Sequence, residues 1–171
     1  MCTNDSGIRK VLIVDDDPAT LRLIAKITAT TGYQVATARD GREAFELIRD
    51  WSPELLVTDW DMPHLSGPQL CRKVREAELP FFVYIMLLTA KSRSEELVEG
   101  LEAGADDFIS KPIEPAVFLA RLKSGARTVV MERRLRDIAR LDPLTGIMNR
   151  RTFHERADDE WDRATRYGHP L

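Results

Sequence analysis

The stretch Val57-Thr58-Asp59-Trp60-Asp61-Met62-Pro63 decides how this chain folds. An apolar run at residues 55–57 leads into the carboxylate of Asp59, and the helix breaker Pro63 follows soon after. This order is typical of the C-terminal end of a buried parallel strand, which is where open α/β sheets bind ligands. An aspartate there is more often a turn residue or a helix cap, so its role depends on which other residues meet it.

Short apolar runs recur on both sides of this stretch. They begin near residues 10, 34, 55, 81 and 107, and each is followed by apolar residues at helical spacing. One βα unit per run is therefore predicted, with the later strands at residues 81–88 and 107–110. A helix from about Ser94, ended by Gly104, is expected to use Leu97 and Leu101 as its apolar face. The predicted fold class is α/β, with five parallel strands and helices on both faces.

A long helix is predicted from residue 114 to residue 141. At 1.5 Å per residue, about 28 residues span about 42 Å, which is too long to pack within this domain, so the second half is expected to project. One seven-residue repeat runs along it, formed by Val117, Ser124, Met131 and Ile138. Arg127 and Arg134 fall where a coiled coil needs apolar residues, so dimerisation through this helix stays open.

The composition fits a soluble globular protein. The chain has 171 residues, 43% of them hydrophobic, which is enough for a core, and a net charge of −3 gives no support to a strongly basic nucleic-acid binder. No DNA partner is therefore expected. No membrane insertion is expected either, because no 18-residue apolar stretch exists. Cys2 and Cys71 have no metal-ligand spacing, and the N-terminus lacks the apolar core of a signal peptide, so a cytoplasmic location is expected.

Polar residues gather at the predicted strand ends, which right-handed connections bring to one edge of the sheet. Six such residues are Asp15, Asp16, Asp17, Asp59, Thr89 and Lys111. Carboxylates at one edge repel each other unless a cation lies among them, and Mg²⁺ fits a set of oxygen ligands. The ammonium group and the hydroxyl could then hold a phosphoryl group on one carboxylate. An ordinary surface of capped turns is the alternative.

The motifs at these strand ends resemble the receiver domain of two-component response regulators. They are Val14-Asp15-Asp16-Asp17, Asp59-Trp60-Asp61-Met62-Pro63, Leu88-Thr89-Ala90 and Lys111-Pro112, and the resemblance runs from about Arg9 to Arg121. It implies a flavodoxin-like (βα)5 fold and a sensor histidine kinase that phosphorylates Asp59. It also implies Mg²⁺ held by Asp15, Asp16, Asp59 and the backbone carbonyl of Asp61.

The same resemblance assigns the remaining roles. Lys111 would pair with the phosphoryl oxygens, in a Lys111–Pro112 bond that the family usually keeps cis. Thr89 and Phe108 would form the switch that follows phosphorylation, and a homodimer would form through the surface around Phe108. The third acid, Asp17, is expected to cap the first helix rather than bind metal.

Residues 142–151 look like the opening of a diguanylate cyclase (GGDEF) domain, whose usual pattern D-x-L-T-G-L-x-N-R-R is matched except at Ile147. This resemblance implies that Asn149 and Asp158 contact the guanine of GTP. A helix cap for Asn149 and a solvated helix face for Asp158 are the alternatives. No two glycines are adjacent, so the signature is missing and the chain as given is not expected to make cyclic di-GMP.

The expected organisation is a flexible N-terminus at 1–8, a receiver domain at 9–121, a linker helix at 122–141 and the first part of a cyclase domain at 142–171. Residues 142–171 are expected to be loosely ordered, in a fragment of a longer protein. A response regulator that controls cyclic di-GMP synthesis is the leading function. The alternative is a non-enzymatic receiver adaptor, whereas a transcription regulator would need a helix-turn-helix motif that the sequence does not show.

Overall fold

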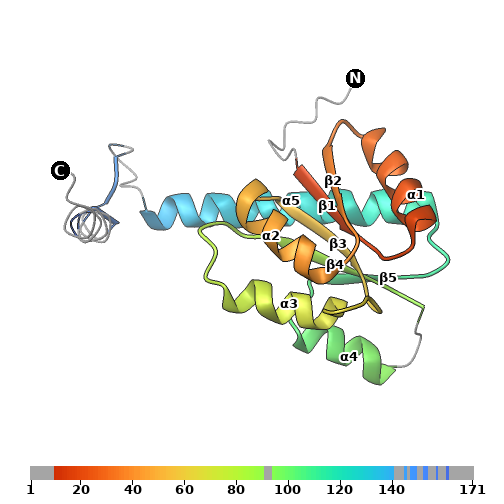
Figure 1. Ribbon diagram of the computed structural model, residues 1–171. Helices are drawn as coiled ribbons and strands as arrows, with labels where there is room; N and C mark the ends of the chain where they lie inside the picture. Colours follow the sequence, from red (N-terminus) through yellow and green to blue (C-terminus); the bar gives the residue numbers. More distant parts are fainter. Residues whose placement is uncertain are drawn as a thin grey trace. The chain divides into compact units, whose positions relative to one another are not determined.

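The computed structural model describes residues 10–90 and 94–140, together with 145, 147–149, 152–153, 157 and 161; side chains are described except at 94–97 and 140. Strands are β1 (Lys10–Val14), β2 (Gln34–Ala38), β3 (Leu55–Asp59), β4 (Tyr84–Thr89) and β5 (Asp107–Ser110). Helices are α1 (Pro18–Ala29), α2 (Gly41–Trp51), α3 (Gly67–Glu76), α4 (Ser94–Glu102) and α5 (Pro115–Arg140). All strand pairs are parallel, in the order β2-β1-β3-β4-β5 (Figure 1).

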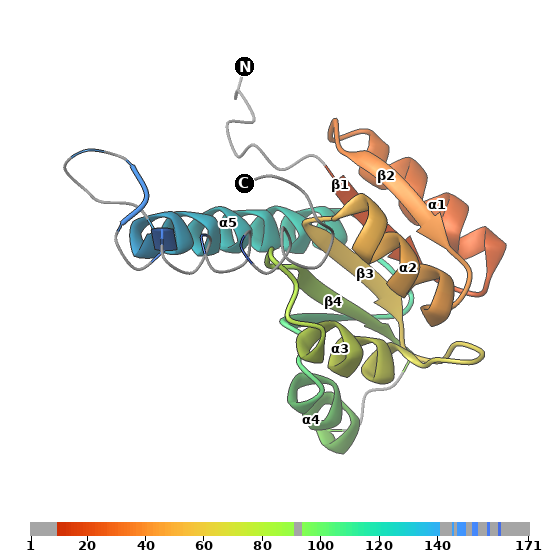
Figure 2. The ribbon, with the colours of Figure 1, turned by 60° about the vertical axis from the view of Figure 1, so that its left-hand side comes forward.

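The sheet is covered on both faces, which explains the apolar runs without polar alternation. Val11 and Ile13 of β1 face the layer of α1 and α5, whereas Leu12 and Val14 face the layer of α2 and α3. The two layers lie on opposite sides of the strands in Figure 2. The predicted five-stranded α/β fold is therefore confirmed.

Local sequence sets the helix starts near the strand ends. Asp17 caps α1 by accepting hydrogen bonds from the backbone N–H groups of Ala19 and Thr20, and Pro18 occupies the first turn. At α3, Ser66 and Gln69 form a reciprocal capping box. These caps fix where the helices begin after β1 and β3, so each of these strand ends is followed by a loop with a defined end.

Two details differ from the sequence prediction. Strand β4 begins at Tyr84 rather than at residue 81, because Phe81 and Phe82 pack at the edge of the core instead of extending the ladder. On α4, Leu101 of the predicted apolar face is 48% exposed, whereas Gly100 is buried, as is Ala103 just after the helix. The side chain of Leu97 lies outside the described residues.

The long C-terminal helix is confirmed as α5, but among the described residues its buried side is not formed by the predicted seven-residue repeat. The buried side of its first half is formed by Phe118, Leu122, Ala126 and Val129. These residues lie on a side of the helix turned away from the predicted repeat, and Met131 and Ile138 of the repeat are exposed. The chain divides into two compact units, residues 1–130 and 131–171. In the described part of the chain, no helix combines the length and the apolar character that crossing a membrane requires.

Candidate functional site

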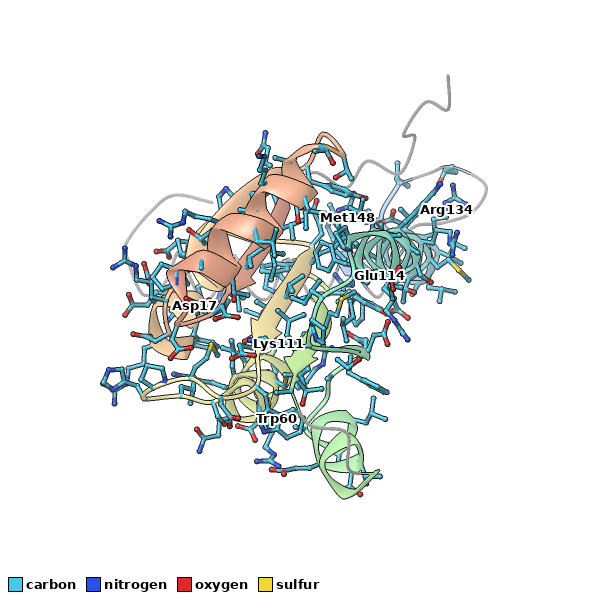
Figure 3. The ribbon with its side chains drawn as sticks, turned by 90° about the vertical axis from the view of Figure 1, so that its right-hand side faces the viewer. Asp17, Trp60, Lys111, Glu114, Arg134 and Met148 are labelled. Carbon is cyan, nitrogen blue, oxygen red and sulfur yellow. The ribbon has the colours of Figure 1, made fainter. Side chains whose placement is uncertain are left out.

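Four strands end at one edge of the sheet, and each contributes a polar residue there. Asp15 directly follows β1, Asp59 ends β3, Thr89 ends β4, and Lys111 directly follows β5. Asp15, Asp59 and Thr89 are buried, and Lys111 is partly buried. Figure 3 shows Lys111 and the α1 cap Asp17 at this same end of the sheet. The predicted convergence at the strand ends is thus present in the structure.

Lys111 bridges the two buried carboxylates. Its Nζ lies 2.7 Å from Oδ1 of Asp59 and 3.0 Å from Oδ2 of Asp15. Its backbone N–H donates to the carbonyl of Thr89 at 2.7 Å, which fixes the start of the β5–α5 loop, and the Lys111–Pro112 bond is cis as expected. One ammonium group therefore pairs with two carboxylates, so the site carries more carboxylates than cations.

Burial decides the direction of the pKa shift of Asp59, whereas the attraction between the two groups decides that of Lys111. Burial raises the pKa of the Asp59 carboxyl, and the hydrogen bond and charge of Lys111 only partly oppose this. Burial works to lower the pKa of Lys111, but its hydrogen bonds to Asp59 and Asp15 outweigh it, so that pKa is raised. The two carboxylates thus stabilise the charged form of Lys111, whereas burial disfavours the charged form of Asp59.

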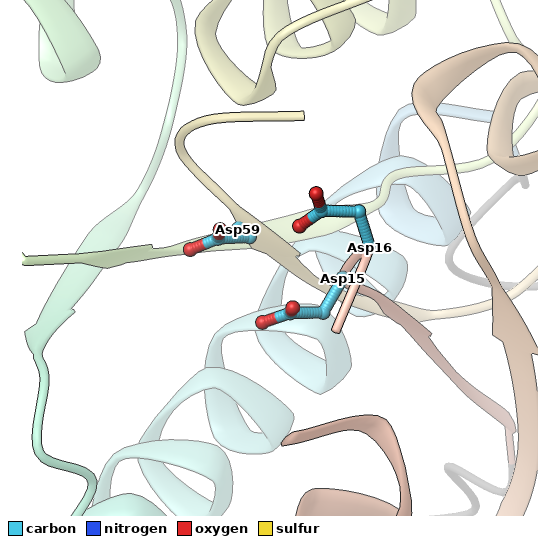
Figure 4. Close-up of side chains that lie close together, drawn as sticks. All are labelled: Asp15, Asp16 and Asp59. Carbon is cyan, nitrogen blue, oxygen red and sulfur yellow. The ribbon is translucent and has the colours of Figure 1, made fainter. Parts of the chain in front are cut away.

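Asp15, Asp16 and Asp59 form a group that could hold a metal ion. One carboxylate oxygen from each lies within 4.8 Å of the others, and Asp16 is the exposed member of the group (Figure 4). A hard divalent cation such as Mg²⁺ prefers this kind of ligand and keeps several waters, which the open side at Asp16 allows. The residues therefore fit Mg²⁺. The backbone carbonyl of the exposed Asp61 stays a predicted ligand.

Asp17 does not join this group through its side chain. Its carboxylate accepts from the hydroxyl of Thr20 and from the backbone of Ala19 and Thr20, which lowers its pKa. Its backbone N–H donates to Oδ1 of Asp15 at 2.9 Å. Asp17 thus caps α1, in agreement with the expectation from sequence, and its backbone N–H orients Asp15.

The backbone around Asp59 is held on two sides. Trp60 donates its N–H to the carbonyl of Leu88 at 2.9 Å, and the N–H of Gly67 donates to the carbonyl of Trp60 at 2.9 Å. A Cβ on Gly67 would overlap the carbonyl oxygen of Asp59, so only glycine lets α3 begin this close to the strand end. The sequence analysis did not single out Gly67 as a residue of the site. The available signal was its position directly after the helix cap Ser66.

The predicted switch residues lie on neighbouring strands. Thr89 is fully buried at the end of β4 and pairs in register with Ser110, and Phe108 of β5 pairs with Leu87. Phe108 is partly buried and lines a small apolar hollow together with Trp60 and Gly100. The guanidinium of Arg121 lies 6.0 Å from the centroid of the Phe108 ring.

In the second unit, Asn149 acts as a helix cap. Its side-chain oxygen accepts from the N–H of Thr152 at 2.9 Å, and its side-chain nitrogen donates to the carbonyl of Ala139 at 2.7 Å. The guanine contact stays a prediction for Asn149, whose side-chain groups are both engaged here. Asp158 lies outside the described residues, as does most of the segment 142–171 whose loose order was predicted.

Known proteins match the part of the chain that carries this site. The family model described as "Response regulator receiver domain" matches residues 11–123. The phosphate regulon transcriptional regulatory protein PhoB of Pseudomonas aeruginosa is 38% identical over 119 residues, covering 70% of this chain and 52% of PhoB. Response regulator MprA of Mycobacterium bovis is 37% identical over 150 residues, covering 82% of this chain and 63% of MprA. The chain therefore spans about half to two thirds of the length of these relatives.

Solved structures give the same result. The receiver domain of a signal transduction histidine kinase from Syntrophus aciditrophicus is 35% identical, with a TM-score of 0.65 over 71% of this chain and 92% of that one. The chemotaxis protein CheY4 of Vibrio cholerae is 31% identical, with a TM-score of 0.65 over 68% of this chain and 98% of that one. The likeness thus covers nearly all of each receiver domain.

Proposed function

This chain belongs to the response regulator receiver family, and from that premise we propose that Asp59 accepts a phosphoryl group from a sensor histidine kinase. The observation that carries the proposal is the position of Lys111, whose ammonium lies 2.7 Å from a buried Asp59 oxygen. An aspartate that served only a turn or a helix cap would not need a partly buried ammonium group at its Oδ1 atom.

The chemistry is a transfer between two nucleophiles. A carboxylate oxygen of Asp59 attacks the phosphorus, the P–O bond to Asp59 forms, and the bond to the donor's imidazole nitrogen breaks. Lys111 is placed to stabilise charge on the phosphoryl oxygens, and the Thr89 hydroxyl is proposed to donate to one of them. A bound Mg²⁺, held by Asp15, Asp16, Asp59 and the Asp61 carbonyl, would neutralise further negative charge.

The outcome of transfer is an electrostatic switch. The phosphoryl group adds about −1.5 to −2 charge to a site that has more carboxylates than cations. We propose that Thr89 and Phe108 respond by moving toward the site, and that the surface around Phe108 then favours a homodimer. Residues 9–121 are proposed as the receiver domain, with residues 122–141 as its linker to an output at 142–171.

For the output we propose a diguanylate cyclase that joins two GTP molecules into cyclic di-GMP. The support is the ten-residue resemblance at 142–151, and Asn149 and Asp158 are its proposed guanine contacts. The alternative is a non-enzymatic receiver adaptor, which the capping role of Asn149 favours. Reading the gene past Leu171 separates the two, because a Gly-Gly-Asp/Glu-Glu-Phe signature supports the cyclase and a stop codon supports the adaptor.

The phosphoacceptor proposal is tested by incubating the protein with Mg²⁺ and acetyl phosphate and weighing it by mass spectrometry. We expect the native chain to gain one phosphoryl group and Asp59→Asn to gain none. The dimer fraction, measured on the same samples, should rise only in the native chain. Equal phosphoryl gain by both variants would remove Asp59 from the role.

A further inference from the structure

Arg75, near the end of α3, joins three segments of the chain. Its Nε donates to the carbonyl of Gly104 at 2.9 Å, and its Nη1 donates to the carbonyl of Val83, directly before β4, at 2.8 Å. Its Nη2 pairs with Oδ2 of Asp106 at 2.7 Å. Each nitrogen of the guanidinium therefore has an acceptor of its own, which fixes the group more firmly than a single surface ion pair would.

Two of these acceptors belong to the turn between α4 and β5. Gly104 has a φ of +98°, and a Cβ there would lie 2.6 Å from Cγ of Arg75, so both the backbone and the contact favour glycine. The N–H of Asp106 donates to the carbonyl of Ile85 at 2.8 Å, and its Oδ2 accepts from the N–H of Ile85 at 2.7 Å. The turn is therefore attached to β4 through Asp106 and to α3 through Arg75.

The middle of α4, which lies beside α3 (Figure 2), is held more weakly. Arg72 of α3 lies 3.9 Å from Glu99 of α4, but both side chains are half exposed, and such pairs add little stability. A Cβ on Gly100 would meet the ring of Trp60, and the small hollow that Phe108 lines lies at this contact. In the part of α4 whose side chains are described, the firm polar attachment to α3 is thus at the C-terminal end.

α3 also connects this turn with the phosphoacceptor. Its first residue, Gly67, donates its N–H to the carbonyl of Trp60, the residue directly after Asp59, at 2.9 Å. Arg75 follows eight residues later in the same helix, about 12 Å along its axis. Because a helix this short is a rigid element, the turn is held at a fixed distance from Asp59.

We propose that Arg75 is a positioning residue for the switch, because it makes the C-terminal end of α4 a fixed pivot. When Thr89 and Phe108 respond to phosphorylation, the underside of α4 loses its resting contacts, and α4 turns about Gly104 instead of shifting as a unit. The inference rests on the proposed phosphorylation and adds the residue that decides how α4 moves.

Hydrogen exchange of the 171-residue chain, followed by mass spectrometry with and without Mg²⁺ and acetyl phosphate, tests the pivot. In the native chain, the phosphodonor should change exchange in residues 94–101 and leave residues 102–107 unchanged. In Arg75→Met, which keeps the length of the side chain without its donors, residues 102–107 should exchange roughly tenfold faster with phosphodonor than without it. Arg72→Met is the matched control, three residues earlier on α3, and should behave like the native chain.

A merely structural contact gives a different result. Its loss would speed exchange in residues 102–107 by the same factor with and without phosphodonor, and that outcome would overturn the proposal. So would a native chain in which phosphorylation changes both segments equally. Arg75→Lys keeps the charge but cannot reach three acceptors at once, so it takes the place of Arg75→Met if that variant does not fold, and the same difference is expected of it.

Phosphoryl gain, weighed on every sample, keeps this test apart from that of the proposed function. If the native chain gains none, the role of Asp59 is wrong, and the pivot is read from local opening of the chain without phosphodonor. Residues 102–107 should then exchange more slowly than residues 94–101 in the native chain and in Arg72→Met, and at a similar rate in Arg75→Met. The same order of exchange in all three chains would overturn the pivot.

Discussion

Asp59 and Lys111 show how a buried ion pair can be kept at a cost to stability. The raised pKa of Asp59 means that its ionised form is less favourable in the folded protein than in the unfolded chain. The resulting loss of stability is fully present above the folded pKa, and it disappears as pH falls toward the unfolded value of 3.8. A charged carboxylate at this position is therefore explained by chemistry rather than by folding.

Replacing Asp59 by asparagine should stabilise the metal-free protein. Asn keeps the shape and removes the buried charge, so we expect the free energy of unfolding at pH 7 to rise by roughly 1 kcal/mol. The gain should shrink as pH falls toward 4. Urea unfolding at several pH values, in the presence of a chelator, measures it. A less stable Asp59→Asn protein at pH 7 would mean that the Lys111 pair outweighs burial.

Substitution of the neighbouring residues Asp16 and Asp17 should affect the stabilisation by Mg²⁺ differently. Asp16 belongs to the carboxylate group, whereas the Asp17 side chain caps α1. Saturating Mg²⁺ at about 100 times its dissociation constant should stabilise the native chain by about 2.7 kcal/mol. Asp16→Asn should lose most of this gain, and Asp17→Asn, which retains a capping oxygen, should keep it. Thermal unfolding with and without Mg²⁺ gives the comparison, and equal losses in both variants would argue against the assigned ligand set.

At the scale of elements, the contact between β3 and α3 sets the shape of the site. Gly67→Ala places a methyl group against the backbone of Asp59, so the first turn of α3 must shift. We expect a loss of about 1–3 kcal/mol in unfolding free energy, together with slower phosphoryl uptake. Gly125→Ala is the matched control, because its methyl group meets the ring of Tyr84 at the start of β4, away from the C-terminal strand ends that form the site. Uptake that slows equally in both variants would show a general packing effect.

The two side-chain hydrogen bonds of Asn149, one of them to the carbonyl of Ala139 in α5, allow a second test of how the elements are held. Asn149→Asp keeps the oxygen that accepts from Thr152 but loses the donor to the carbonyl of Ala139, whereas Asn149→Ala loses both. Hydrogen exchange of the Thr152 amide should therefore stay slow in Asn149→Asp and become fast in Asn149→Ala. Fast exchange in both variants would show that the link to Ala139, and not the cap, orders this helix start.

For the whole molecule, sequence alone predicted the parallel sheet, the alternation of strands and helices along the chain, and the polar residues at the C-terminal ends of the strands. It could do so because each parallel strand is covered on both faces and its apolar run is unbroken, as at Val11 to Val14. Leu101 was misjudged because helical spacing shows which residues share a face but not which face the sheet covers. The close approach of Gly67 could not be predicted, since it depends on a backbone contact between elements that only the fold brings together.

The most direct test of the account locates the phosphoryl group on the chain. After phosphorylation with Mg²⁺ and acetyl phosphate, borohydride reduces an aspartyl phosphate to homoserine and leaves free carboxylates unchanged. Trypsin then releases Asp59 within residues 50–72 and Asp15, Asp16 and Asp17 within residues 11–22. The account predicts homoserine at position 59 alone. Homoserine at position 15 or 16, or at Asp61 within the same peptide as Asp59, would contradict it.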